Sequence, residues 1–170
     1  MTTLVLIGPM GAGKTSIGRK VAKSLGVPFF DTDIAIVRAH GPIEEIFASQ
    51  GEAVFRGLER AAVREGLAGG GVVSLGGGAV LDADTRADLA HHRVVLLTVE
   101  PHVVASRIRG TERPLLQAED AAARWVEISA ARRPIYEELA DVTFDTSSGP
   151  LQNVVEAVAE WARSTEEETK

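Results

Sequence analysis

The chain has 170 residues, 45% hydrophobic and 25% charged, which is typical of one soluble, folded domain and excludes a disordered or fibrous chain. With 24 acidic and 18 basic side chains, its net charge of −6 disfavours nucleic acid or an anionic membrane as a partner. Cysteine is absent, which excludes disulfides and thiolate chemistry. Because residues 1–3 show no signal-peptide pattern and no apolar run reaches about 20 residues, we expect a cytoplasmic protein.

Aliphatic segments that end in glycine or polar residues alternate with segments of helical periodicity. Strands are predicted at 4–7, 27–30, 72–75, 94–99 and 142–145. A first helix ends at Gly26, and further helices are predicted over about 34–39, 43–49, 52–67, 83–90, 101–108, 120–139 and 151–163. This alternation predicts an α/β three-layer sandwich, a five-stranded parallel sheet with helices on both faces. A single domain would span 1–163, followed by a disordered acidic tail at 164–170.

Residues 8–15 read Gly-Pro-Met-Gly-Ala-Gly-Lys-Thr and match the pattern G-x-x-x-x-G-K-[ST] between the first strand and the first helix. Such a loop turns successive backbone amides toward one anion at a positive helix N-terminus. Lys14 would reach the outer phosphates, and the Thr15 hydroxyl would ligate Mg²⁺. The alternative is an ordinary glycine-rich turn. The predicted nucleotide-binding residues of this loop are Gly11, Ala12, Gly13, Lys14, Thr15 and Ser16.

The acceptor and the metal require acidic groups elsewhere. A guanine-specific GTPase is disfavoured, because its N-K-x-D motif needs an asparagine and the only one here is Asn153, followed by Val-Val-Glu. The strand at 72–75 also lacks a terminal aspartate for Mg²⁺. Asp31 and Asp33 close the second strand on one face, so we expect Asp31 to serve the metal and Asp33 to accept a hydrogen bond from, and help deprotonate, a substrate hydroxyl. Alternatively, Asp33 caps a helix that starts at Ile34.

Three arginines could grip a carboxylate or a phosphate with a planar, bidentate guanidinium: Arg56, Arg113 and Arg132. Alternatively, Arg56 forms a surface ion pair with Glu59, Arg113 lies in a charged loop, and Arg132 lies beside Arg133 on a solvated face. Three glycines at 76–78 directly follow the third strand, where they would let a ligand lie against bare backbone or would form a plain loop.

Taken in order from residue 4 to about 160, these elements resemble shikimate kinase. The matching elements are the loop at 8–15, Asp31-Thr-Asp33, Phe55-Arg56 with Glu59, the glycines at 76–78, Arg113-Pro-Leu-Leu and Arg132-Arg-Pro-Ile-Tyr. The resemblance implies a nucleoside-monophosphate-kinase-like fold, ATP and Mg²⁺ as partners, and phosphorylation of the 3-hydroxyl of shikimate. A gluconate kinase and a non-catalytic ATP-binding module remain the alternatives, and a monomer is the default.

The resemblance also implies a role for each matching residue. Shikimate would be bound by Asp33, Arg56, Gly76, Gly77, Gly78 and Arg132. The first two belong to a substrate-binding helical region of about 33–62. The catalytic residues would be Lys14, Asp33 and Arg113, the last on a mobile lid of about 110–121. Thr15 and Asp31 would serve Mg²⁺, with Ser74 acting through water, and Glu59 would orient Arg56. Arg107 or Arg109, with Pro150, would sandwich the adenine.

Overall fold

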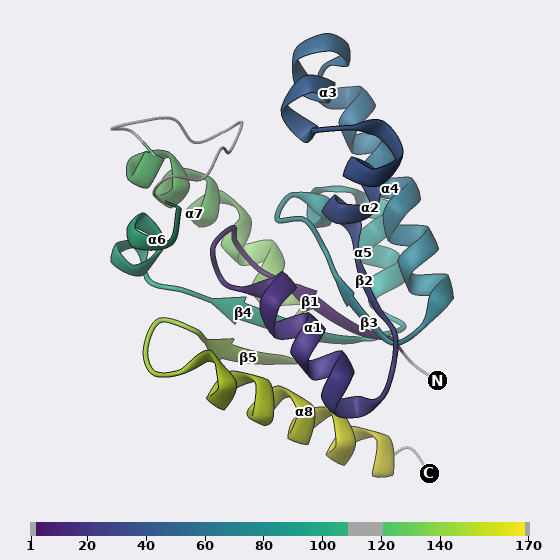
Figure 1. The fold of residues 1–170 in the computed structure, drawn as a ribbon, viewed down its shortest axis with the longest axis vertical. Coiled ribbons are helices and arrows are strands. Elements are labelled where there is room, and N and C mark those ends of the chain that lie inside the picture. Colours follow the sequence, from purple (N-terminus) through teal and green to yellow (C-terminus); the bar gives the residue numbers. More distant parts are fainter. Residues whose placement is uncertain (1–2, 109–120, 169–170) are drawn as a thin grey trace.

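A parallel sheet organises the computed structural model, which describes residues 3–108 and 121–168. The sheet order is β2-β3-β1-β4-β5 (Figure 1). The strands are β1 (Leu4–Ile7), β2 (Phe29–Asp31), β3 (Val72–Ser74), β4 (Arg93–Thr98) and β5 (Val142–Asp145). The predicted five-stranded parallel sheet is confirmed. Strand β2 begins later than predicted, because the Val27 amide still donates to Ala22 at the end of the preceding helix.

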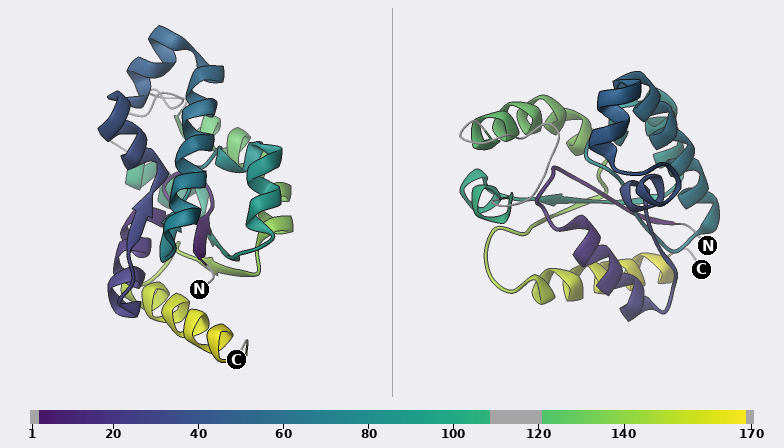
Figure 2. Two further views of the ribbon diagram at one scale, coloured as in Figure 1. Left: turned by 90° about the vertical axis from the view of Figure 1, so that its right-hand side faces the viewer. Right: turned by 45° about the horizontal axis from the view of Figure 1, so that its top comes forward.

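Helices connect the strands and cover both faces of the sheet. They are α1 (Lys14–Leu25), α2 (Thr32–His40), α3 (Ile43–Gln50), α4 (Glu52–Gly69), α5 (Ala83–Leu89), α6 (Pro101–Ile108), α7 (Ala121–Leu139) and α8 (Leu151–Glu167), with a 3-10 turn η1 (Ala79–Leu81). Helices α1 and α8 lie on one face, and α4, α5 and α7 lie on the other (Figure 2). Among the described residues, we find no helix both long enough and apolar enough to span a membrane.

The two sheet faces form separate hydrophobic cores because successive strand residues point to opposite sides. Leu4 and Leu6 pack in the core beneath α1 and α8, whereas Val5 and Ile7 pack in the core beneath α4, α5 and α7. A third, smaller cluster lies away from the sheet, between the helices α2, α3 and α4 at the top of Figure 1. Its buried members are Ile36, Ile46, Phe55 and Ala62.

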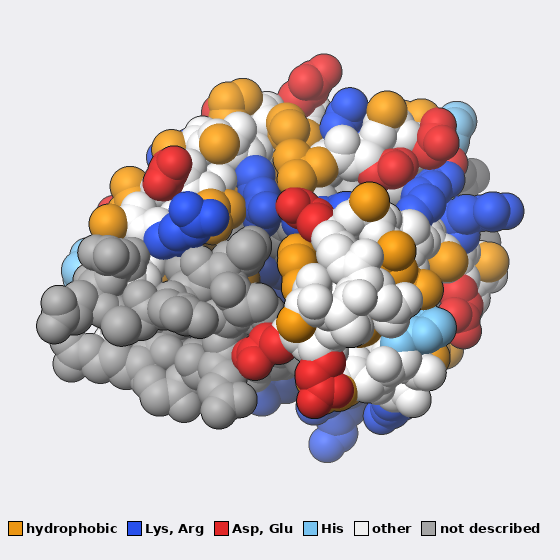
Figure 3. Space-filling model, turned by 90° about the horizontal axis from the view of Figure 1, so that it is seen from above, with side chains coloured by type: hydrophobic (Ala, Val, Ile, Leu, Met, Phe, Trp, Pro, Cys, Tyr) orange, Lys and Arg blue, Asp and Glu red, His pale blue; other side chains and the backbone are white. Residues whose placement is uncertain are grey.

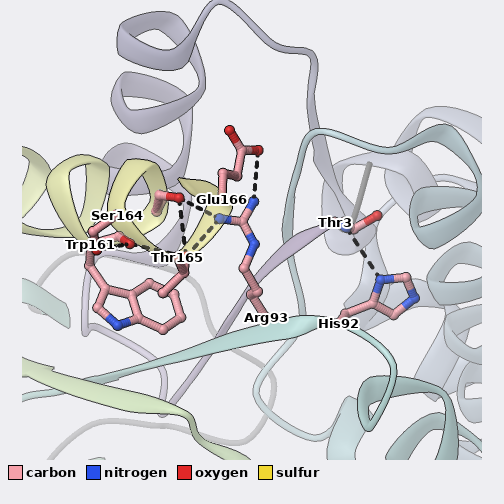
Figure 4. A network of polar contacts seen from close by, with 8 residues as sticks. Thr3, His92, Arg93, Trp161, Ser164, Thr165 and Glu166 are labelled. Carbon is pink, nitrogen blue, oxygen red and sulfur yellow. Dashed lines mark hydrogen bonds and ion pairs between the residues drawn. The ribbon is translucent and has the colours of Figure 1, made fainter. Parts of the chain in front are cut away.

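The prediction of a disordered tail at 164–170 is wrong for residues 164–167, which continue helix α8. The physical reason is a polar connection to the distant strand β4 (Figure 4). Arg93 donates to the carbonyl of Ala162 at 2.6 Å and to the Thr165 hydroxyl at 3.0 Å, and pairs with Glu166 at 3.3 Å. Residues 165 and 166 of the tail are thus held by a basic side chain from the sheet.

Candidate active site

Two loops and the first turn of helix α2 meet where β1, β3 and β2 end, since parallel neighbours present their carboxyl ends at one edge of the sheet. The phosphate loop at 8–13 follows β1, Asp33 follows β2, and the three glycines follow β3. Viewed from above, basic side chains lie in a furrow near the middle of the molecule (Figure 3). The residues that the sequence singled out separately are therefore neighbours in the fold.

The phosphate loop has the geometry of an anion cradle. Gly13, at φ 88°, is the left-handed residue before α1, and a side chain at Gly8 would collide with the backbone carbonyl of Leu97. The Lys14 ammonium folds back over the loop, donating to the carbonyls of Gly8 at 2.7 Å and Pro9 at 2.9 Å. Its charge and the N-terminus of α1 therefore both lie at the place where phosphates would bind.

The two predicted metal ligands are adjacent. The Thr15 hydroxyl donates to Asp31 Oδ2 at 2.6 Å, and the buried Ser74 is the register partner of Asp31 across the sheet. Asp31 Oδ1 also accepts from the amide of Ile34 at 3.0 Å, so Asp31, not Asp33, is the N-cap of α2. Hydroxyl and carboxylate oxygens are ligands that Mg²⁺ prefers, usually with phosphate oxygens completing its shell. The residues present therefore fit Mg²⁺.

Around the three glycines, charged side chains approach bare backbone. A Cβ at Gly76 would lie 2.7 Å from Asp33 Oδ1 and 3.0 Å from Glu59 Oε2, and one at Gly77 would lie 3.5 Å from Arg132 Nη1. At Gly78 a Cβ would overlap the guanidinium of Arg56. These glycines therefore leave room for the charged groups and for a ligand beside them, which argues against a plain loop.

Arg56 is oriented by a buried carboxylate. Its Nη1 donates to Glu59 at 2.8 Å, and Nη2 donates to the exposed Glu52 at 3.3 Å. Glu59 is only 3% exposed, and this burial raises its carboxyl pKa to about 7, while the Arg56 guanidinium acts in the opposite direction. The pairing with Glu59 and the position beside Gly78 occur together, so the two interpretations of Arg56 are not exclusive.

Helix α7 contributes Arg132 and a tyrosine that the sequence did not single out as a site residue. Tyr136 is buried, and its hydroxyl donates to the carbonyl of Gly77 at 2.5 Å. Its neighbour Arg133, in contrast, has a side chain 71% exposed that pairs with Glu137 one turn away. The solvated face of α7 therefore carries Arg133, whereas Arg132 faces the glycines.

Some predicted nucleotide-binding residues have other surroundings or fall outside the described part of the chain. The Arg107 guanidinium donates to the carbonyl of Gly11 at 2.8 Å and to the Thr146 carbonyl at 2.6 Å. Pro150 is the N-cap residue of α8, in the segment that follows Thr146. Arg109 and Arg113, with residues 110–120 of the predicted lid, lie outside the described residues.

A phosphate loop on a five-stranded parallel sheet, with a hydroxyl and a carboxylate that fit Mg²⁺ and a second basic cluster beside it, defines a P-loop phosphotransferase of the nucleoside-monophosphate-kinase-like fold. The model of the shikimate kinase family matches residues 10–163. The chain therefore belongs to the shikimate kinase family.

Individual relatives agree with this assignment. Over 158 residues, 91% of either chain, the protein is 48% identical to the shikimate kinase of Thermobifida fusca. Its structure is similar to that of the shikimate kinase from Acinetobacter baumannii in complex with shikimate, with a TM-score of 0.91, 34% identity and coverage of 97% and 94% of the two chains. A gluconokinase from Sinorhizobium meliloti superposes at a TM-score of 0.63, with 25% identity and coverage of 98% and 94%.

Proposed function

We propose that this chain transfers the γ-phosphoryl group of ATP to the 3-hydroxyl of shikimate. The observation that carries the proposal is the placement of Arg56, Arg132 and Asp33 around the glycines at 76–78. These glycines follow β3, which pairs with β1, the strand from which the phosphate loop leaves. Two guanidiniums suit a carboxylate, and Asp33 suits a hydroxyl that must lose its proton. An acceptor that carries both groups, as shikimate does, fits this arrangement.

The chemistry asks mainly for positioning and charge neutralisation, because a transferring phosphoryl group resembles metaphosphate. Lys14 and the amides of the phosphate loop would hold the outer phosphates, and Arg113 would add a further positive charge. Thr15 and Asp31 would hold Mg²⁺, with Ser74 acting through water. When bound, Mg²⁺ would neutralise charge on the phosphate oxygens.

On the acceptor side, Arg56 and Arg132 would grip the carboxylate of shikimate while Asp33 accepts the proton of the reacting hydroxyl. Glu59 would keep the Arg56 guanidinium in place, since the two side chains are already paired at 2.8 Å. The glycines at 76–78 would let the ring of the acceptor lie against the backbone. We further propose that the protein works as a cytoplasmic monomer.

A coupled assay of ADP release, with ATP and Mg²⁺ and with shikimate, gluconate or no acceptor, tests the proposal. We expect turnover with shikimate that is lost in Asp33→Asn. Turnover with gluconate alone would assign the site to a sugar-acid kinase, and the absence of turnover with every acceptor would leave an ATP-binding module. The proposed oligomeric state is checked separately by sedimentation velocity.

A further inference from the structure

The phosphate loop is supported from its outer side by side chains that sequence motifs do not reveal. A loop can turn its amides toward an anion only if the carbonyls of the same peptides point away, and those carbonyls then need donors of their own. In this structure the successive carbonyls of Met10 and Gly11 accept from Trp125 Nε1 at 2.7 Å and from Arg107 Nη1 at 2.8 Å. Trp125 comes from α7 and Arg107 from α6.

The two donors are themselves held firmly. Trp125 is 6% exposed and, from the first turns of α7, packs with the core that holds Leu4 and Leu6, whereas Tyr136 further along α7 belongs to the other core. The Arg107 guanidinium makes two further bonds to Thr146, one to its hydroxyl at 3.1 Å and one to its carbonyl at 2.6 Å. Thr146 is buried, and its hydroxyl lies 2.9 Å from the carbonyl of Ala12, the next peptide of the loop.

Packing alone does not fix this side of the loop. Pro9 and Trp125 both line a cavity of about 500 Å³ between β4, β5, α6 and α7. The loop therefore depends on directed hydrogen bonds at Met10 and Gly11, whereas its first two carbonyls are held by Lys14, which would turn to the phosphates when nucleotide binds.

We infer that Trp125 and Arg107 are positioning residues for phosphoryl transfer, which aim the loop amides at the nucleotide phosphates by holding the carbonyls of Met10 and Gly11. This inference rests on the nucleotide-binding part of the proposed function and not on the identity of the acceptor. It gives Arg107 a role through the loop backbone, beside the adenine contact expected from the family resemblance. Trp125 has no counterpart among the residues that the sequence singled out.

The test is calorimetric titration of MgADP and, separately, of shikimate into Trp125→Phe and Arg107→Met. Trp125→Phe keeps an aromatic ring but loses the N–H, so we expect MgADP to bind about 2- to 10-fold more weakly. Arg107→Met loses a charged donor, so we expect MgADP to bind about 10- to 100-fold more weakly. Shikimate affinity should stay within about twofold of the parent value. Arg133→Met, which removes an exposed arginine of the same helix α7, is the matched control and should change neither affinity.

Fluorescence gives a second, independent measurement. The chain has two tryptophans, Trp125 and Trp161, and Trp161 is on α8, away from the phosphate loop. In a Trp161→Phe background, MgADP should change the emission of Trp125, and shikimate alone should change it less. Three results would each overturn the inference. They are an unchanged MgADP affinity in a folded Trp125→Phe protein, an equal loss of affinity for MgADP and shikimate, and an emission of Trp125 that MgADP does not change. If MgADP binds as expected but shikimate is not phosphorylated, only the acceptor assignment fails.

Discussion

Gly78→Ala tests whether the Arg56 guanidinium occupies the substrate side of the glycine segment. The backbone of Gly78, with φ −96° and ψ −1°, accepts alanine without strain. An added Cβ would nevertheless lie only 2.7 Å from Arg56 Nη2 and 2.8 Å from Cζ. Because these atoms are the end of a long side chain, Arg56 would move and the fold would persist.

The displaced guanidinium of Arg56 could no longer bind the acceptor carboxylate from the position that it has in this structure. One lost hydrogen bond to a charged group is worth about 1.5–3 kcal/mol, or about a 10- to 150-fold rise in KM for shikimate. Steady-state kinetics with each substrate varied in turn should show this rise with little change in KM for ATP. A folded Gly78→Ala enzyme with the parent KM for shikimate would refute the placement of Arg56.

The adjacent residue of α4 provides a matched control. A Cβ at Gly57 would meet nothing within 4 Å, although Gly57 directly follows Arg56 in the chain. Gly57→Ala should therefore leave both KM values unchanged and raise the free energy of unfolding by about 0.5–1 kcal/mol, because alanine favours the helix. A large loss of shikimate affinity in this control would show that the region, and not the overlap with Arg56, determines the effect.

Three further predictions concern the buried acid, the metal and the C-terminal helix. Since the folded-state pKa of Glu59, about 7, lies above its ordinary 4.5, its contribution to stability is full below the lower value and lost as pH rises through the higher one. Glu59→Gln should therefore reduce the change of the free energy of unfolding with pH, by at most about 3 kcal/mol between the two values. The same pH profile in the variant and the parent protein would contradict this. Asp31→Asn keeps a capping side chain but loses the charge, so Tm should hold while the Mg²⁺ concentration for half-maximal rate rises on the order of tenfold, and an unchanged requirement would exclude Asp31 as a ligand. Arg93→Met should lower Tm by about 3–8 °C in a calorimetric scan, whereas the exposed Arg133→Met should not, and equal shifts would rule out the connection to α8.

The sheet and the phosphate loop could be predicted because their signals are local. Aliphatic runs that end on glycine or aspartate mark buried parallel strands, and the loop motif fixes its own position between strand and helix. The meeting of Asp33 with the glycines at 76–78 could also be anticipated, since parallel strands end at one edge. Arg56 lies inside helix α4, so only the family resemblance led us to expect it there.

Other features depend on contacts distant in sequence and could not be predicted from local patterns. Asp31 and Asp33 are both good capping residues, and only the tertiary position of the strand end decides that Asp31 caps α2. Trp125 has no motif around it, yet it reaches a carbonyl 115 residues earlier in the chain. Taken alone, the polar residues 164–167 indicate a solvated end, and only the fold brings Arg93 of strand β4 beside them.

The small hydrophobic cluster of α2, α3 and α4 has a consequence for how this protein can change over evolution. Phe55 lies next to Arg56 and packs against Phe47 within this cluster, with ring centroids 4.9 Å apart. Arg56, which we propose binds the acceptor, is therefore supported by a core that is distinct from the two cores of the sheet. If the proposed acceptor site is right, mutations in this cluster can change it while the phosphate loop stays intact, so that one scaffold can acquire new acceptors.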